Sequence, residues 1–181
     1  MKDLVIDKIP NIVASFCQPI QKILFVVSSG YWKKVYQKYR EEYDIDSDFK
    51  FRGTNIIILS EKTNHKFSSG KNSYIGENSS INLEGGNVTI GNNCHIGQRF
   101  KVHTSGSNTD DIIQNKDIWR TKYYGDIIIE DNVWIGNDVT VLGNVKIGHN
   151  SVVGTCSVIT KNVKSNTVVV GNNKVVKKCC F

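Results

Sequence analysis

The sequence predicts an all-β protein, a stack of parallel coils built from short strands and turns. The main observation is an unbroken six-residue spacing of apolar residues, at Ile129, Ile135, Val141, Ile147, Val153 and Ile159. A second small or apolar residue follows four positions after each of these, from Val133 to Val163. Glycine stands directly behind the apolar residue in several repeats, for example at Gly136 and Gly148.

A period of six matches neither an α-helix, which repeats every 3.6 residues, nor a simple strand, which repeats every two. It is typical of a chain that forms a short strand, turns and repeats, with each apolar residue pointing inward. Three such strands complete one triangular coil, and stacked coils bury a continuous apolar column. Asparagine and aspartate at the next positions tolerate the positive φ of tight turns. Chance spacing in an ordinary β-sandwich does not account for so many successive repeats.

The limits of the repeat predict the domain organisation. Residues 1–48 carry apolar residues at helical spacing and predict a helical segment. It would cap the open end of the coil, or contact an acceptor or a membrane surface. The segments that follow are the coil at 49–178, a projecting loop inside it at 104–126, and a tail at 179–181. Within the coil domain, the C-terminal segment 168–178 is expected to be a last strand followed by a basic tail. A loop this long in a compact domain usually has a function.

Composition narrows the class of protein. The 181 residues are 39% hydrophobic and 22% charged, and no apolar run is long enough to cross a membrane. No secretory leader pattern is visible, so we expect a cytoplasmic protein, with the inner face of the membrane as the alternative. The five cysteines show no metal-binding spacing, and no metal site is expected. The net charge of +6 is compatible with several anionic partners, but no nucleic-acid-binding module is recognised.

Residues 133–137 (VWIGN) and 146–154 (KIGHNSVVG) resemble the hexapeptide-repeat acyltransferases. The similarity covers residues 70–178 and is greatest to the galactoside, antibiotic and surface-polysaccharide O-acetyltransferases. This resemblance implies that the parallel β-helix is left-handed, against the usual right-handed crossover. It also implies a homotrimer with active sites between neighbouring subunits, and acetyl-CoA as the co-substrate.

Acetyl transfer from a thioester to a hydroxyl needs a general base, and histidine is the natural base near neutral pH. His103 stands where the projecting loop leaves the coil, and it is the candidate base. The other histidines are His95 and His149, at expected turn positions, and His65, in the irregular first part of the coil.

Three further positions take their meaning from the resemblance. In polysaccharide-type relatives the catalytic histidine stands several residues beyond the position of Val102, where this chain has Ser107 and Asn108. Trp134, at an expected turn position, matches the tryptophan of the family's V-W-I-G motif, beside the acetyl donor, or else fills a trimer contact. Asn82 matches an asparagine near the active site of the galactoside-type enzymes, where it would orient the acceptor or the base, or else is a plain turn residue.

The resemblance also implies a coenzyme A site. Its residues would be Trp134, Asn137, Gly154, Thr155, Thr160, Lys161, Lys174 and Lys177. Backbone amides would bind the pantetheine arm, and lysines would meet the phosphates as point charges. The family's Gly-x-Pro before the tail is absent here, since the chain reads Gly171-Asn172-Asn173.

The function predicted from these features is acetyl-CoA-dependent O-acetylation of a sugar hydroxyl, in a bacterial surface polysaccharide or its precursor. A serine acetyltransferase is one alternative, since residues 141–144 (VLGN) are similar to that family, although the chain lacks its large helical N-terminal domain. A catalytically inactive β-helix that serves as a binding or scaffold protein is the other. This alternative remains because Ser107 and Asn108 stand where the resemblance would place a catalytic histidine.

Overall fold

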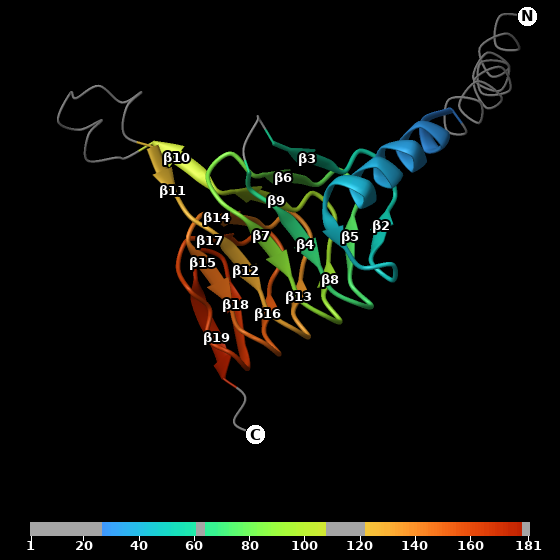
Figure 1. The fold of residues 1–181 in the computed structure, drawn as a ribbon. Helices are drawn as coiled ribbons and strands as arrows, with labels where there is room; N and C mark the ends of the chain where they lie inside the picture. The colour runs from blue at the N-terminus through green and yellow to red at the C-terminus, as the bar shows by residue number, and fades with distance from the viewer. Residues whose placement is uncertain (1–26, 61–63, 108–121, 179–181) are drawn as a thin grey trace, which may run out of the picture. The chain divides into compact units, whose positions relative to one another are not determined.

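The computed structural model describes residues 27–60, 64–107 and 122–178. Most of its strands form three sheets (Figure 1). Sheet A contains β1 (Asp44–Ile45), β4 (Phe67–Ser69), β7 (Val88–Ile90), β12 (Ile127–Ile129) and β15 (Val145–Ile147). Sheet B contains β2 (Lys50–Arg52), β5 (Tyr74–Gly76), β8 (His95–Ile96), β13 (Trp134–Ile135), β16 (Val152–Val153), β18 (Thr167–Val170) and β19 (Lys174–Lys178). Sheet C contains β3 (Ile57–Leu59), β6 (Ser80–Asn82), β9 (Lys101–His103), β14 (Thr140–Leu142) and β17 (Val158–Ile159).

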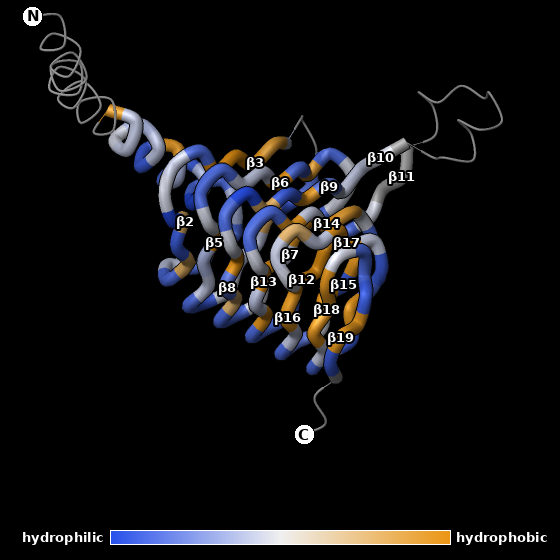
Figure 2. The backbone as a smooth tube through the Cα atoms, turned by 180° about the vertical axis from the view of Figure 1, so that it is seen from behind, coloured by the Kyte–Doolittle hydropathy of each residue, from blue (hydrophilic) through white to orange (hydrophobic). Residues whose placement is uncertain are grey.

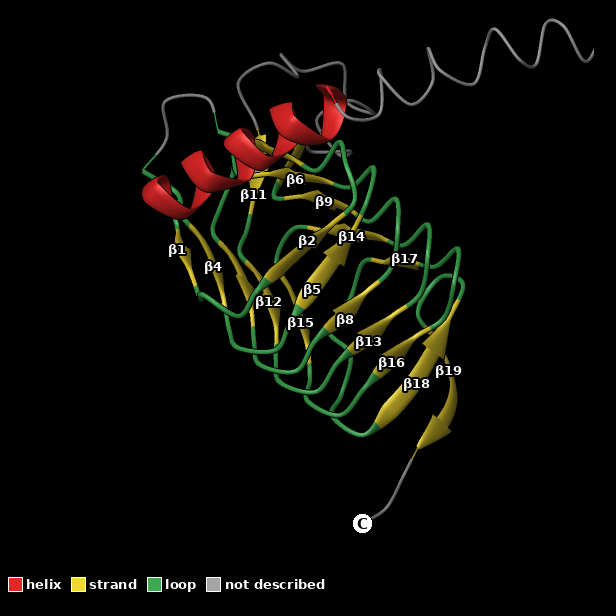
Figure 3. Ribbon diagram, turned by 90° about the vertical axis from the view of Figure 1, so that its right-hand side faces the viewer, coloured by secondary structure: helices red, strands yellow, loops and turns green. Residues whose placement is uncertain are grey.

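From β1 to β17, apart from the separate pair β10 and β11, successive strands visit the sheets in the order A, B, C and then return to A. Each strand therefore pairs with the strands one coil before and one coil after it, as β7 pairs with β4 and β12. In the same way β13 pairs with β8 and β16, and all these pairs are parallel. Figure 3 shows the strands of sheet B side by side along the coil. The predicted all-β coil is thus confirmed as a three-sided parallel β-helix.

The core is the apolar column that the six-residue period predicts. On sheet B, Ile96, Ile135 and Val153 stand in register on adjacent strands, and each is at most 1% exposed. The corresponding residues of sheets A and C are buried too, including Ile129, Val141, Ile147 and Ile159. Figure 2 shows the apolar residues along the strands and polar residues at the corners.

The corners of the coil carry the asparagines that the sequence placed in turns. Asn93, Asn132, Asn150 and Asn166 all have φ between 55° and 58° and stack at the corner between sheets A and B. Each side chain bonds to the next, with N···O distances of 3.1, 3.2 and 3.0 Å. Asparagine suits this place because it adopts positive φ at low cost and its amide both donates and accepts.

One helix is present in the described residues, at 27–42, where a helical segment was predicted. The chain divides into two compact units between Lys38 and Tyr39. The last helical turn belongs with the coil, since Tyr39 Oη accepts the Ile58 N–H at 3.1 Å and Arg40 donates to the carbonyl of Asp46 at 2.8 Å. The capping role of residues 1–48 stays a prediction, and residues 1–26 lie outside the described part. No helix in the described ranges is both long and apolar enough to cross a bilayer.

Two antiparallel pairs interrupt the parallel pattern. Strands β10 (Ser105–Ser107) and β11 (Lys122–Tyr124) form a ribbon that leaves the corner between sheets C and A, at the predicted projecting loop. At the C-terminal end of the coil, β19 folds back on β18 as an antiparallel strand. The C-terminal segment was expected to be a strand followed by a basic tail; it is instead a hairpin, and Lys174 and Lys177 lie on its outer strand.

Candidate functional site

Asn82 and His103 lie side by side at one edge of sheet C. They are the last residues of β6 and β9 and are directly in register, while Leu142 of β14 flanks His103 on its other side. Both side chains are half-buried. The structure therefore brings together two of the three residues that the sequence singled out for catalysis.

Hydrogen bonds hold the backbone beside this pair. The Thr104 hydroxyl donates to the Asn82 carbonyl at 2.8 Å and accepts the Gly85 N–H at 3.0 Å. Asn82 Oδ1 accepts the Glu84 N–H at 2.8 Å. The His103 imidazole makes no hydrogen bond to any residue in the described ranges. Ser107 ends β10, and Asn108 lies outside those ranges.

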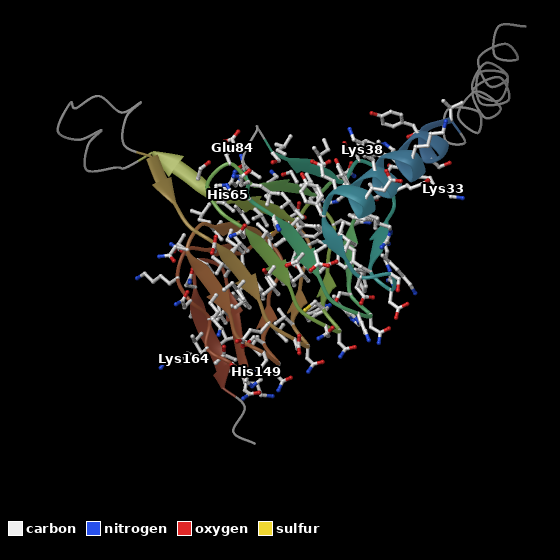
Figure 4. The ribbon with its side chains drawn as sticks, in the orientation of Figure 1. Lys33, Lys38, His65, Glu84, His149 and Lys164 are labelled. Atoms are coloured by element: carbon white, nitrogen blue, oxygen red, sulfur yellow. The ribbon has the colours of Figure 1, made fainter. Side chains whose placement is uncertain are left out.

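A second imidazole at this corner was not singled out by the sequence. His65 Nδ1 lies 2.8 Å from the carbonyl oxygen of Leu83, which directly follows Asn82. A carbonyl only accepts, so Nδ1 carries the proton in the neutral ring and Nε2 keeps its lone pair. Glu84 comes next, and its Oε2 accepts the Ser105 hydroxyl at 3.3 Å. Figure 4 shows His65 and Glu84 where β10 leaves the coil.

Trp134 lies on the outer face of sheet B. It was expected at a turn position, as was His95, but both are strand residues, on β13 and β8, and they are in register with each other. The Trp134 side chain is 50% exposed. His95 in turn stacks on Tyr74, with ring centroids 4.9 Å apart. Strand assignment fails from sequence here because the side chain that points outward from a coil is not constrained by core packing.

The predicted coenzyme A residues fall into separate groups. Asn137, Gly154 and Thr155 lie at the corner between sheets B and C, where Asn137 Oδ1 accepts the Gln98 N–H at 2.9 Å. The coils approach closely there, because a Cβ at Gly136 would come within 2.6 Å of Thr155 Oγ1.

Thr160 and Lys161 follow β17 at the other edge of sheet C. The Thr160 N–H donates to Asn173 Oδ1 at 2.9 Å, and Asn173 Nδ2 donates to the Lys161 carbonyl at 3.0 Å. Lys174 and Lys177, on β19, are exposed.

One chain does not bring the Asn137 corner to His103. Asn137 precedes β14, whereas His103 is in register with Leu142 at the end of that strand. The whole width of sheet C therefore separates them. Reacting groups must approach to within about 3–3.5 Å.

His149 is remote from this region, on the C-terminal coils (Figure 4). It is exposed at a turn, as predicted, and its Nδ1 lies 3.0 Å from Ser165 Oγ and 3.3 Å from Glu130 Oε2. Hydrogen bonds from Lys146, and then from the His149 N–H, lower the pKa of Glu130 to about 2. Among the described residues, no group of three or more metal-binding side chains lies together.

Fold and corner geometry define a class of protein, the parallel β-helices built from hexapeptide repeats. Residues 126–161 match the family model described as bacterial transferase hexapeptide (six repeats). The predicted resemblance to the hexapeptide-repeat acetyltransferases is therefore confirmed.

Relatives and solved structures agree with this assignment. Galactoside O-acetyltransferase of Escherichia coli is 34% identical over 111 residues, which are 58% of this chain and 53% of that protein. The crystal structure of a maltose O-acetyltransferase from Clostridium difficile has a TM-score of 0.66 and 26% identity, covering 87% of this chain and 89% of that one. A galactoside acetyltransferase in complex with coenzyme A has a TM-score of 0.54 and 28% identity, covering 72% and 65%. The chain spans about half the length of the curated relatives it matches.

Proposed function

We propose that this protein transfers an acetyl group from acetyl-CoA to a hydroxyl of a sugar. The observation that carries the proposal is the Asn82–His103 pair, placed at the edge of a coil that resembles a galactoside acetyltransferase bound to coenzyme A. In the reaction, the acceptor oxygen attacks the thioester carbonyl carbon while a histidine takes the hydroxyl proton. The tetrahedral intermediate then collapses, the C–S bond breaks, and the proton passes to the coenzyme A sulfur.

In this proposal the residues take the roles expected from the sequence. His103 is the base predicted from sequence, and Asn82 beside it orients the acceptor hydroxyl or the imidazole. Trp134 packs against the donor. The pantetheine arm lies along the corner of Asn137, Gly154 and Thr155. The lysines of the C-terminal coils, Lys161, Lys174 and Lys177, meet the phosphates as point charges.

A homotrimer completes the site in this proposal. Because the width of sheet C separates Asn137 from His103, the donor corner of one copy must meet the His103 edge of another. The exposed Trp134 on sheet B is suited to such a contact, since aromatic side chains are enriched at protein interfaces. We also propose that the coil is left-handed, as the similarity to the maltose O-acetyltransferase structure supports. The acceptor would be a bacterial surface polysaccharide or its precursor, in the cytoplasm or at the inner face of the membrane.

The test is acetyl-CoA turnover, measured as thiol release, with a panel of sugars and with serine. Turnover that needs a sugar acceptor, and that falls at least about 100-fold in His103→Ala, supports both the reaction and the base. His149→Ala is the matched control, because that histidine is exposed on other coils. Full turnover in His103→Ala would reject this base. The next variant would then be His65→Ala, because Nε2 of His65 is a second imidazole nitrogen at this corner that can accept a proton. Serine-dependent turnover would instead favour the serine acetyltransferase.

A scaffold protein without catalysis is the second candidate. It is favoured by Ser107 and Asn108, which stand where polysaccharide-type relatives have their catalytic histidine. Measurable coenzyme A binding without turnover on any acceptor would support it.

A further inference from the structure

The guanidinium of Arg52 lies over an aromatic stack on sheet B. Its guanidinium carbon lies 3.6 Å from the centre of the Tyr74 ring. Tyr74 in turn stacks on His95, with ring centroids 4.9 Å apart and an interplanar angle of 28°. The three residues come from successive coils, since β2, β5 and β8 are adjacent strands (Figure 3). This cation–π contact favours one orientation of a long, exposed side chain.

The guanidinium keeps its hydrogen-bonding capacity. It makes no hydrogen bond and no ion pair with any residue in the described ranges. A guanidinium presents five N–H donors in a rigid fork that fits carboxylate or phosphate, and stacking on a ring leaves the edge of that fork accessible. This contrasts with Arg99, an exposed arginine at the nearby corner, which is engaged by Asp138 at 2.6 Å.

Arg52 lines a hollow that also contains the proposed donor contact. The hollow is about 300 Å³ and is lined by Arg52, Tyr74, Gln98 and Asn137, together with Gly76, Ile96 and Gly97. Asn137 Oδ1 is engaged by the Gln98 N–H, so its Nδ2 is the group left to donate into the hollow. The carboxylate of Glu77 accepts from Gln98 Nε2 at 3.1 Å and is not among the lining residues.

We infer that this hollow binds the carboxylate of an acidic sugar, so that the acceptor of the proposed acetyl transfer is a uronic or similar sugar acid. That the ligand is the acceptor rests on the proposed function. The binding of a sugar carboxylate in the hollow does not depend on it. Arg52 would hold the carboxylate in a bidentate pair, and Asn137 Nδ2 would donate to the same ligand or to the thioester beside it.

A phosphate of coenzyme A is the other source of an oxyanion. The lysines suited to phosphates, Lys161, Lys174 and Lys177, belong to the last coils. Arg52 belongs to the first, and Asn137 lies between them along the coil. Arg52 is thus on the side of Asn137 away from those lysines, where an acceptor rather than the nucleotide would lie.

The direct test is calorimetric or NMR titration of the full chain with glucuronate and with glucose. We expect glucuronate to bind at least about 10-fold more tightly than glucose, and Arg52→Gln to remove that preference. Arg52→Lys should retain only part of it, because a lysine cannot form the bidentate pair. The matched control is Arg99→Gln, which removes the same charge from the nearby corner and should leave the preference unchanged. Absence of glucuronate binding, equal binding of both sugars, or an undiminished preference in Arg52→Gln would overturn the inference.

Kinetics separates the two sources of anion. If the carboxylate belongs to the acceptor, Arg52→Gln raises the KM for an acidic acceptor and leaves the KM for acetyl-CoA unchanged. A rise confined to the KM for acetyl-CoA would assign the site to a phosphate and reject the acceptor. Failure of the proposed function would look different: no turnover on any acceptor, with the Arg52-dependent binding of glucuronate still present.

Discussion

The coils formed by β1 to β9 and those formed by β12 to β18 have the same topology and differ in regularity. Inward positions of the C-terminal coils are mostly isoleucine and valine, whereas Phe49, Phe67 and Phe100 fill the N-terminal coils together with a buried Ser69. Between sheets C and A, the C-terminal coils turn directly from β14 to β15, whereas the earlier coils need longer corners.

This difference indicates where polar and charged side chains can form a site in a β-helix. A uniform repeat presents the same turn at every level, which suits an extended ligand such as the pantetheine arm. Where corners differ in length, side chains that no repeat brings together come into contact, as His65 and Leu83 do. His65, Glu84 and Arg52 all belong to the less regular coils.

The largest effects are expected from cavities in the shared column. Ile135→Ala in the C-terminal coils and Ile75→Ala in the N-terminal coils remove side chains that are 1% and 0% exposed. Each should lower the free energy of unfolding in urea by about 2–4 kcal/mol, since the coil cannot collapse onto the space left. The exposed Ile128→Ala is the control and should cost far less. A much smaller loss for Ile75→Ala would show that the two regions do not share one cooperative core.

Next comes the asparagine stack that joins the two regions. Asn132 has φ of 58° and bonds to Asn93 on one side and Asn150 on the other. Asn132→Ala should cost about 1–2 kcal/mol in thermal or urea unfolding, because alanine resists positive φ and breaks both side-chain bonds. Asn132→Gly restores the backbone freedom alone and should recover about half of the loss. Equal losses in both variants would mean that backbone conformation contributes nothing here.

A gain in stability is expected in the N-terminal coils. Ser69 is 8% exposed, and its hydroxyl has no hydrogen-bond partner in the described structure, while its register neighbour on β7 is Ile90. Ser69→Ala should raise the free energy of unfolding by about 1 kcal/mol, because an unsatisfied buried hydroxyl is removed. Ser79→Ala is the matched control: that hydroxyl donates to the Gly76 carbonyl at 2.7 Å and accepts the Phe100 N–H at 3.1 Å. It should lose stability, and an identical response of the two serines would contradict the argument.

The smallest effect is pH-dependent and confined to the C-terminal coils. The pKa of Glu130 falls from 4.5 to about 2 on folding, because Lys146 and the His149 N–H bind its ionised form. Ionised Glu130 therefore stabilises the fold above about pH 4.5, and this contribution is lost as the pH falls toward 2. Urea midpoints measured between pH 5 and pH 2 should fall less steeply in Glu130→Gln. Glu84→Gln serves as the comparison, and parallel curves for Glu130→Gln and wild type would refute the linkage.

Much of the fold could be predicted because its determinants are local. The six-residue spacing at positions such as Ile135 and Val153 identifies the inward face, and asparagines such as Asn132 identify the corners. His103 was selected from sequence because it stands where the projecting loop leaves the coil, and Asn82 because it matches an asparagine of the galactoside-type enzymes. The coil places the two residues in register. The strand position of Trp134 was missed, because outward residues of a coil carry no periodic constraint.

By itself, then, the sequence determined the coil, its apolar column and the turns, since each depends on a short repeating pattern of burial and backbone conformation. Only the tertiary structure decided that Arg52 lies on Tyr74 and that His65 bonds to the carbonyl of Leu83. These two contacts depend on how successive coils come into register across corners of unequal length. A local period contains no information about the length of a corner once the repeat is interrupted, so the contacts that give this coil its chemistry emerge only when the coils stack.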